Sequence, residues 1–430
     1  MASQDALDYL YQLQSHGIRP GLETITQLLG RLSDPQNAFR TIHIAGTNGK
    51  GSTAAMTAAI LMESGYRVGL YTSPHLIDFS ERIRVQGRPI PEARLIQLTE
   101  QARRSVSGLN PTFFEFTTAL AFLQFAQEAV DLAVVEVGLG GRFDATNTVR
   151  SLVSIITNID YDHEQFLGRK IGQIAYEKAG IIQPEVPVVT AAERPSASSV
   201  IRAECRNRRA PLYRLGKEFS IRNIHSPFFD YHGIRQRLTG LSSPLPGRHQ
   251  FLNAALALAA VELLDQQGWP IKTDAITQGL SKVEWEGRLE FVSDDPLLIL
   301  DGAHNPAGAA VLKEFLDELK RARPGSRLIL VVGILKDKDI QAMARLLEPL
   351  AETVILTQPD DPRAASVDEL VNSMPRSGKV SICSRVPDAV RQAQSLARPE
   401  DVICVTGSLY TVGEAKAYLS GRGRPSRLKG

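Results

Sequence analysis

A glycine-rich run near the N-terminus carries the residue types that bind a nucleoside triphosphate. It reads Gly46, Thr47, Asn48, Gly49, Lys50, Gly51 and Ser52. An apolar stretch precedes the run and an Ala-rich stretch follows it, which predicts the strand, loop and helix of a phosphate-binding loop. Backbone N–H groups at a helix start cradle phosphates, while Lys50 supplies a charge and Ser52 a hydroxyl for Mg²⁺. We therefore expect the chain to use a nucleoside triphosphate.

The loop departs from the usual pattern G-x-x-x-x-G-K-[ST] at two positions. Ile44 stands where the pattern has glycine, and Gly51 separates Lys50 from Ser52. A glycine-rich turn without a ligand is one alternative, and Lys50 and Ser52 at a helix start argue against it. A GTPase or a motor is another alternative, but the chain has no Asn-Lys-x-Asp guanine motif.

Polar residues follow several apolar, strand-like runs farther along the chain. They include Ser73, Glu136, Asp160, Asp162, His163, Asp301, His304, Asn305 and Ser408. Ligands of open parallel sheets bind at the carboxyl ends of the strands. These residues are therefore candidates for a site that faces the phosphate-binding loop.

Two of these candidates have the chemistry of a metal site. Glu136 ends an apolar run, where a buried carboxylate is costly unless it is paired or bound to a metal. A salt bridge from Glu136 to Arg142 is the alternative. His163 follows a strand and lies beside Asp160 and Asp162 in the sequence, which favours a functional histidine.

Strand-like runs alternate with helical patterns along most of the chain, which predicts α/β layers around mostly parallel sheets. In the first part, the expected strands are residues 41–45, 67–72, 132–137, 153–158 and 187–190. The expected helices of this part are residues 52–64, 114–129, 171–179 and 250–264. Short antiparallel strands are expected within residues 212–239.

A second alternation begins near residue 297 and predicts a doubly wound domain. Its expected strands are residues 297–300, 328–332, 353–356, 380–383 and 402–405, and its last helix is 412–419. The expected boundary is the segment 284–296, which holds two Asp and a Pro. We predict a P-loop-type, mostly parallel sheet domain over residues 1–287 and a smaller Rossmann-like doubly wound domain over residues 288–430.

The length and composition indicate a soluble globular protein of two or three domains. The 430 residues are 43% hydrophobic and 22% charged, and the net charge is +2, which gives no reason to expect a nucleic-acid or membrane partner. The three cysteines (Cys205, Cys383 and Cys404) are widely spaced and form no metal pattern. No run reaches the roughly 18 apolar residues of a membrane span. We expect a cytoplasmic protein.

Several segments, in order along the chain, resemble the motifs of the folylpolyglutamate synthase/dihydrofolate synthase family of Mur-ligase-like amide ligases. They are residues 46–52 (GTNGKGS), 72–76 (TSPHL), 81–83 (ERI), 136–147 (EVGLGGRFDATN), 177–181 (EKAGI), 301–306 (DGAHNP) and 407–410 (GSLY). The resemblance covers essentially the whole chain. It implies a Mur-ligase central-type domain, a C-terminal glutamate-ligase domain, and a two-step reaction. ATP phosphorylates a carboxylate of dihydropteroate or a folate, and L-glutamate attacks the acyl phosphate to give an amide, ADP and phosphate.

The resemblance also implies residue roles. ATP contacts fall on Gly46, Thr47, Asn48, Gly49, Lys50, Gly51, Ser52, Asn253, Arg288 and Asp301. Two Mg²⁺ sites fall on Ser52 and on Ser73, Glu136 and His163. His304 and Ser408 are the residues expected to bind the substrate glutamate, and Lys50, His304 and Lys178 are the expected catalytic residues. In this family Lys178 is commonly carboxylated by CO₂, whereas its pattern alone indicates a solvated helix lysine.

Simpler roles remain open for several of these residues. Asn253 is also explained as a polar group of a helix, and Arg288 as a linker charge. His304 is also explained as a helix N-cap before Pro306. Residues 336–338 are explained as a solvated loop.

The pteroate or folate acceptor is expected at two aromatic segments. They are Thr112, Phe113, Phe114 and Glu115, and Phe143, Asp144 and Ala145, with residues 17–23 as a further candidate. Aromatic faces stack flat heterocycles, and a carboxylate bonds their N–H groups. Core packing explains Phe113 and Phe114 almost as well.

Three alternatives to a folate ligase remain at this point. A Mur ligase acting on a UDP-sugar usually carries an extra N-terminal domain, whereas only about 45 residues precede this loop. A nucleotide-binding regulator would need no glutamate site. A scaffold with a relic loop would not need Lys50, Ser52, Glu136 or His163. We expect a monomer that makes dihydrofolate, extends polyglutamate tails, or does both.

Overall fold

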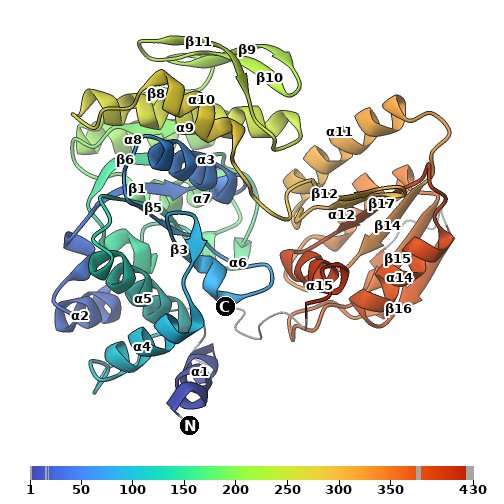
Figure 1. The fold of residues 1–430 in the computed structure, drawn as a ribbon, viewed down its shortest axis with the longest axis horizontal. Helices are drawn as coiled ribbons and strands as arrows, with labels where there is room; N and C mark the ends of the chain where they lie inside the picture. The colour runs from blue at the N-terminus through green and yellow to red at the C-terminus, as the bar shows by residue number, and fades with distance from the viewer. Residues whose placement is uncertain (1, 15–16, 18, 374–378, 423–430) are drawn as a thin grey trace.

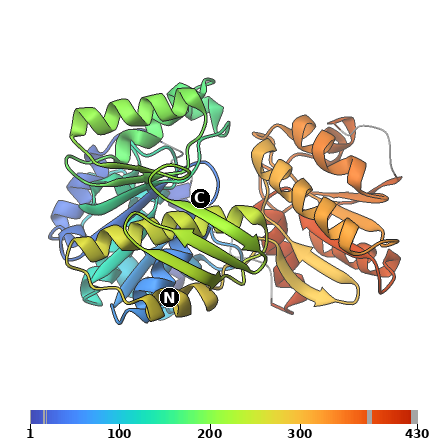
Figure 2. The ribbon, with the colours of Figure 1, turned by 90° about the horizontal axis from the view of Figure 1, so that it is seen from above.

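The computed structural model describes residues 2–14, 17, 19–373 and 379–422. Two bodies are visible in Figure 1, one in blue to yellow and one in orange to red. Figure 2 shows both from above, and within the described residues the chain passes from the first to the second after α10 and before β12. The two bodies are each built on a sheet, of eight strands and of six strands.

The eight-stranded sheet has the order β4-β3-β2-β5-β1-β6-β7-β8. Its strands are β1 (Arg40–Ala45), β2 (Val68–Tyr71), β3 (Ile83–Val85), β4 (Arg88–Pro89), β5 (Leu132–Glu136), β6 (Ser151–Ile156), β7 (Val188–Thr190) and β8 (Leu212–Arg214). The neighbours β2, β5, β1, β6, β7 and β8 all pair in parallel, whereas the β2–β3 and β3–β4 pairs at one edge are antiparallel. The carboxyl ends of the parallel strands therefore lie at one edge of the sheet.

Helices cover both faces of this sheet, which explains its continuous apolar strands. On one face lie α3 (Lys50–Glu63), α9 (Arg248–Gln266) and α10 (Thr273–Ser281), and on the other lie α1 (Ala2–Leu13), α2 (Glu23–Arg31), α4 (Glu92–Arg103) and α5 (Phe113–Gln127). Within β5, Val134 packs on the first side and Val135 on the second. Three further helices, α6 (Glu164–Leu167), α7 (Ile171–Lys178) and α8 (Pro195–Arg208), follow β6 and β7.

A three-stranded antiparallel sheet lies over α9. Its strands are β9 (Ser220–His225), β10 (Phe228–His232) and β11 (Arg237–Ser242). Tyr231 donates a hydrogen bond of 2.9 Å from its hydroxyl to Glu262 of α9, which ties this sheet to the helix. The prediction of antiparallel strands in 212–239 is wrong for β8, which pairs in parallel with β7 in the large sheet.

The second body is a six-stranded sheet of order β12-β13-β17-β14-β15-β16. Its strands are β12 (Glu290–Asp294), β13 (Leu297–Leu300), β14 (Leu328–Val332), β15 (Thr353–Thr357), β16 (Lys379–Cys383) and β17 (Val402–Thr406). One face packs on α11 (Pro306–Ala322), α12 (Ile340–Leu347) and α13 (Val367–Ser373), and the other on α14 (Val386–Leu396) and α15 (Leu409–Leu419). The predicted α/β fold class, a large mostly parallel sheet followed by a smaller doubly wound one, is confirmed.

One sequence expectation fails at the start of the second body. Residues 290–294 were expected in a linker, but they form β12, which pairs antiparallel with β13. Its residues are mostly exposed, so they lack the apolar run that marks a buried strand. In the described residues no helix is long and apolar enough to cross a membrane. Cys404 is buried in the core, as expected.

Candidate active site

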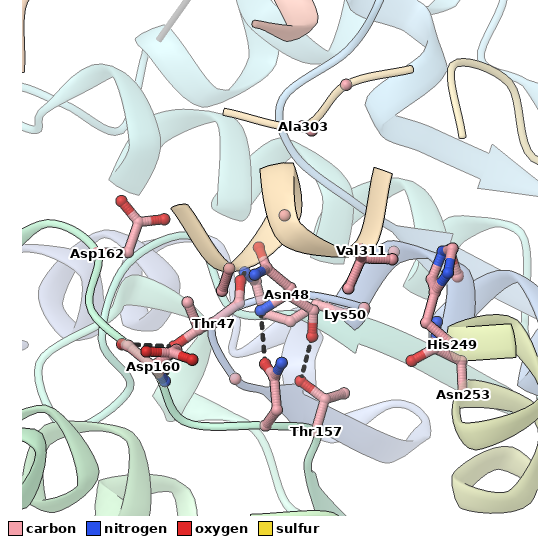
Figure 3. A pocket seen from close by; sticks show the side chains of 18 of the residues that line it. Thr47, Asn48, Lys50, Thr157, Asp160, Asp162, His249, Asn253, Ala303 and Val311 are labelled. Atoms are coloured by element: carbon pink, nitrogen blue, oxygen red, sulfur yellow. Dashed lines mark hydrogen bonds between the residues drawn. The ribbon is translucent and has the colours of Figure 1, made fainter. Parts of the chain in front are cut away.

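The predicted phosphate-binding loop joins β1 to α3, at the carboxyl edge of the large sheet. Side chains after β6 fix the loop backbone from below (Figure 3). Thr157 donates a hydrogen bond of 2.7 Å to the Asn48 carbonyl, and the Asn48 N–H donates one of 2.8 Å to Asn158. Hydrogen bonds between these two side chains and the backbone of Asn48 therefore fix the conformation of the loop.

Two glycines of the loop are required by close neighbours. Gly46 has φ +145°, and a Cβ there would lie 1.8 Å from the Thr157 hydroxyl oxygen. At Gly51 a Cβ would lie 3.0 Å from the indole ring of Trp285. The departure from the usual pattern after Lys50 thus has a physical reason, because Trp285 occupies the space that a larger residue would need.

A cavity of about 550 Å³ opens over this loop. Residues of both bodies line it, and they include every predicted ATP-binding and metal-binding residue: Gly46, Thr47, Asn48, Gly49, Lys50, Gly51, Ser52, Ser73, Glu136, His163, Asn253, Arg288 and Asp301. Lys178 and His304 also line it. We call this space the nucleotide cavity.

Glu136 is buried at the end of β5 and accepts a hydrogen bond of 3.2 Å from the Ser73 N–H. Burial raises the pKa of Glu136, and the charges of Lys50 and Arg288 oppose this. The alternative salt bridge to Arg142 does not form, because Arg142 stacks over the Tyr176 ring, 3.9 Å from its centroid. Among the described residues no cation lies within 4 Å of the Glu136 carboxylate, which leaves it available to an added cation.

His163 lines the same cavity as Glu136 and has a left-handed backbone, with φ 50°. Burial lowers the pKa of His163 to about 4, although Asp162 favours the charged form. A neutral imidazole is the form that binds a metal. In the described part of the chain, no three His, Cys, Asp or Glu side chains form a metal-binding group. The predicted metal set of Ser73, Glu136 and His163 has only two such side chains, so it stays a prediction.

Lys178 ends α7 beneath the loop. It is buried, and its ammonium donates a hydrogen bond of 2.8 Å to the Gly46 carbonyl. Burial and the charge of Lys50 lower the pKa of Lys178 to about 7. The alternative of a solvated helix lysine is therefore wrong.

Asp301 and Asn253 approach the nucleotide cavity from different bodies. The Asp301 carboxylate accepts hydrogen bonds of 3.0 Å from the N–H groups of Leu289 and Ala303, which fixes it after β13. Asn253 lies so close to Gly49 that a Cβ on that glycine would be 2.3 Å from its side-chain oxygen. His249, one turn earlier in α9, lines the same cavity and was not predicted (Figure 3).

His304 stands where the two bodies meet. Its Nδ1 lies 2.8 Å from the Gly302 carbonyl, and its Nε2 lies 3.5 Å from Asp162. His304 is not the N-cap of α11, because that position belongs to Asn305. Ser408 caps α15 by accepting a hydrogen bond of 3.1 Å from the Thr411 N–H, so its hydroxyl is already partly used.

A second cavity, of about 500 Å³, lies next to the first. We call it the acceptor cavity. Six of the seven predicted acceptor residues line it: Thr112, Phe114, Glu115, Phe143, Asp144 and Ala145. Ser408 lines it too, as do Gly17, Arg19, Pro20 and Gly21 from the candidate stretch 17–23, whose residue 18 lies outside the described residues.

The acceptor residues differ in how free their side chains are. Phe143 is 51% exposed, whereas Phe113 is 4% exposed, packs in the core and does not line the cavity. Thr112 and Glu115 form a reciprocal capping box at the start of α5. Asp144 accepts hydrogen bonds from the Leu139 and Thr146 N–H groups. The aromatic ring of Phe143 is therefore the most available contact for a flat ligand.

The two cavities share a wall. The residues that line both are Ser73, Pro74, Gly138, Leu139, Gly140, His163, His304 and Leu409. This wall holds two predicted metal-binding residues and one predicted glutamate-binding residue. A group in the acceptor cavity would thus meet the terminal phosphate of a nucleotide at this wall.

Polar contacts between the bodies were not predicted. Lys338 was expected in a solvated loop, but its side chain is buried and donates a hydrogen bond of 2.7 Å to Asp162. Burial alone would raise the pKa of Asp162, yet its contact with His304 and the charges of His163 and Lys338 hold that pKa well below the usual range. Only the position of Asp162 next to His163 signalled it in the sequence.

Comparisons with known proteins agree with this geometry. Residues 44–261 match the Mur ligase middle domain, and residues 287–409 match the Mur ligase glutamate ligase domain. The chain is 38% identical to the dihydrofolate synthase/folylpolyglutamate synthase of Bacillus subtilis, over 97% of this chain and 99% of that protein.

Two solved structures are similar over nearly the whole chain. One is Escherichia coli FolC in complex with DHPP and ADP, with TM-score 0.89, 32% identity, and coverage of 97% of this chain and 98% of that one. The other is the Yersinia pestis bifunctional enzyme complexed with AMPPNP and Mn ion, with TM-score 0.88, 35% identity, and the same coverage of 97% and 98%. The chain therefore belongs to the dihydrofolate synthase/folylpolyglutamate synthase family of Mur ligases.

Proposed function

We propose that this chain is an ATP-dependent ligase that joins L-glutamate to dihydropteroate and to reduced folates through an acyl phosphate. The observation that carries the proposal is the wall shared by the nucleotide cavity and the acceptor cavity. Residues 1–287 would bind ATP and the acceptor, and residues 288–430 would close over them and supply the glutamate site.

In the first step an acceptor carboxylate oxygen attacks the γ-phosphorus of ATP. The new O–P bond forms as the bond to the β,γ-bridging oxygen breaks, and ADP leaves. Lys50, the loop N–H groups and Arg288 face the position of the phosphates in the nucleotide cavity. Fixed positive charge and positioning supply most of the rate in such transfers.

In the second step the glutamate amine attacks the acyl carbon. The neutral amine forms the C–N bond, the bond from carbon to the phosphate oxygen breaks, and inorganic phosphate leaves. The nitrogen releases one proton to solvent and keeps the other as the amide N–H. His304 and Ser408 would hold the incoming glutamate, because both line the acceptor cavity and His304 also lines the nucleotide cavity.

We assign two Mg²⁺ sites to this reaction. Ser52 would contribute to the first, and Ser73, Glu136 and His163 to the second. The buried Glu136 carboxylate without a nearby cation and the neutral His163 fit such an ion. A divalent cation there would offset the negative charge of the phosphates. Carboxylated Lys178 would add an anion beside Lys50.

The proposal also covers the acceptor-binding residues, the cellular compartment and the oligomeric state. Thr112, Phe114, Glu115, Phe143 and the adjacent 144–145 would bind the pteroate end. The three free thiols suit the reducing cytoplasm, and we propose a monomer.

Phosphate release from purified protein tests this function. ATP and L-glutamate are supplied with dihydropteroate or with a tetrahydrofolate, and each ingredient is omitted in turn. The proposal predicts release that needs glutamate and either acceptor, and Lys50→Ala abolishes it. ATP hydrolysis at the same rate with and without glutamate would instead support a nucleotide-binding regulator.

A further inference from the structure

Arg82 is a buried arginine on the wall of the acceptor cavity. It ends the short 3₁₀ helix η3 (Phe79–Arg82), which leads into β3. Its side chain is almost fully enclosed, because the residue is only 1% exposed. It nevertheless lines the acceptor cavity, together with Ser73 and Pro74 of the shared wall.

The contacts of its guanidinium group are neutral. Nε donates a hydrogen bond of 2.9 Å to Nδ1 of His75. The guanidinium carbon lies 5.6 Å from the ring centroid of Phe79 and 5.4 Å from that of Phe113. Nη2 is buried and has no hydrogen-bond partner. Within the described ranges no carboxylate lies within 4 Å of Arg82.

The acidic neighbour in the sequence does not compensate this charge. Glu81 uses its carboxylate to accept hydrogen bonds from the N–H groups of residues 76, 77 and 78. Burial lowers the pKa of Arg82, while Tyr71, Tyr410, Glu136 and, with the smallest effect, Glu81 oppose that change. A buried cation without an anion is destabilising, and an apolar residue of similar size would pack between two phenyl rings at a lower cost.

The position of Arg82 indicates which anion would compensate it. The Thr72 N–H donates a hydrogen bond of 3.1 Å to the Arg82 carbonyl, so Arg82 is fixed beside the segment that carries Ser73. Glu136, a candidate metal ligand, is close enough to act on the pKa of Arg82. Arg82 thus lines the acceptor cavity next to Ser73 and Pro74, two residues of the wall that it shares with the nucleotide cavity.

We propose that Arg82 binds the reacting carboxylate of the acceptor and holds it at the wall shared by the two cavities. The inference rests on the proposed ligase function and adds a binding residue to it. A guanidinium is suited to this task because it presents two parallel N–H donors to a carboxylate. Functional sites often contain a residue that destabilises the protein without its ligand but binds the ligand when it is present.

The test compares Arg82→Met and Arg82→Lys with the wild type, and uses Arg88→Met as the control. Arg88 is an exposed arginine on β4, in the hairpin that follows Arg82. For Arg82→Met we expect the KM for the acceptor to rise about 100-fold, with the KM for ATP changed less than about 3-fold. The KM of Arg82→Lys for the acceptor should be intermediate, because lysine keeps the positive charge and loses the two parallel N–H donors. Arg88→Met should match the wild type.

Thermal unfolding separates binding from a packing role. If Arg82 serves the acceptor, Arg82→Met keeps or raises the Tm of the empty protein and loses the Tm increase that dihydropteroate with ADP gives the wild type. A lower Tm of the empty protein with an unchanged KM for the acceptor would overturn the proposal in favour of packing. If Arg82→Met does not fold, the KM of Arg82→Lys decides, and a wild-type value overturns the proposal.

The two acceptors identify the carboxylate. Dihydropteroate has one carboxylate, which reacts, whereas a folate also carries a non-reacting one. We expect the KM to rise with both acceptors. A rise with the reduced folate alone would overturn the assignment to the reacting group. If the wild type itself shows no glutamate-dependent turnover, the proposed function fails, a result distinct from an active enzyme whose kinetics do not respond at Arg82.

Discussion

The side-chain amides of Asn48 and Asn305 exchange two hydrogen bonds, of 3.1 and 3.0 Å, between the two bodies of the molecule. Asn48 belongs to the phosphate-binding loop, and Asn305 caps α11 by accepting a hydrogen bond from the Gly308 N–H. The amide of Asn305 also donates a hydrogen bond of 2.9 Å to Asp162. The loop and the second body are therefore joined at the centre of the site.

Asn305→Asp tests whether this contact supports catalysis. Aspartate keeps the helix cap but loses both donors and places a like charge beside Asp162, which weakens the contact between the two bodies and leaves the core of each intact. We expect kcat/KM to fall about 100-fold, with little change in Tm. Asn305→Ser is the control for the donors, since it keeps a neutral cap and should lose less. Wild-type kinetics in Asn305→Asp would show that the Asn48–Asn305 contact between the two bodies is not needed for catalysis.

His304→Ala separates glutamate use from ATP use. His304 lies on the shared wall and contacts Gly302 and Asp162, and among the described residues the structure shows no hydrogen bond from it to the phosphate-binding loop. We expect the KM for glutamate to rise at least 10-fold, with the KM for ATP changed less than about 3-fold. His249→Ala, in the nucleotide cavity, should show the opposite pattern. An equal rise of both constants at His304 would count against a glutamate site there.

Lys178 should react with CO₂ in a pH-dependent manner. Its pKa of about 7 means that the neutral amine, the form that adds CO₂, becomes the major form as the pH rises through 7. At a fixed concentration of dissolved ¹³CO₂, we expect a carbamate signal by ¹³C NMR that grows from pH 6 to pH 8. The signal should be lost in Lys178→Met and kept in Lys170→Met, an exposed lysine at the start of α7. A signal that survives in Lys178→Met would rule out this site.

His43 should make the fold sensitive to acid. It is fully buried in β1, its Nε2 lies 2.9 Å from the Thr146 hydroxyl, and burial lowers its pKa to about 3. The unfolded chain binds a proton below pH 6.5 while the folded one does not, so stability is complete above pH 6.5 and falls as the pH decreases towards 3. The loss at pH 5 is on the order of 1–2 kcal/mol.

The effect of His43 is measured by the Tm at pH 7.5 and at pH 5.0. His43→Gln should lose less Tm between these values than the wild type does. His225→Gln, an exposed histidine on β9, is the control and should behave as the wild type. If His43→Gln and the wild type lose the same Tm, protonation of His43 does not contribute to acid unfolding.

Residues that follow strands were predictable from the sequence. Glu136 and His163 come at the ends of apolar runs, and parallel strands bring those ends to one edge, so the structure places both on the nucleotide cavity. The fold class was predictable for the same reason, because long apolar runs separated by helical patterns leave few alternatives. The role of Trp285 was not predictable from the sequence, because its contact with Gly51 joins two segments that are far apart in the chain.

Burial between distant segments set the limit of the prediction. Lys178 and Lys338 have the pattern of exposed lysines, and only the packing of α7 under the loop and of one body against the other buries them. Phe113 and Phe114 are adjacent and look equivalent, yet only Phe114 faces the acceptor cavity. Strand β12 was missed because its residues are exposed and lack an apolar pattern.

The acyl phosphate is tested most directly by following oxygen. Dihydropteroate labelled with ¹⁸O in both carboxylate oxygens is incubated with the enzyme, ATP and glutamate, and the released phosphate is examined by mass spectrometry. If the carboxylate is phosphorylated before the amine attacks, each phosphate carries one ¹⁸O from the acceptor and the amide keeps the other. Phosphate that carries no ¹⁸O, released while the amide forms, would contradict activation of the carboxylate by ATP.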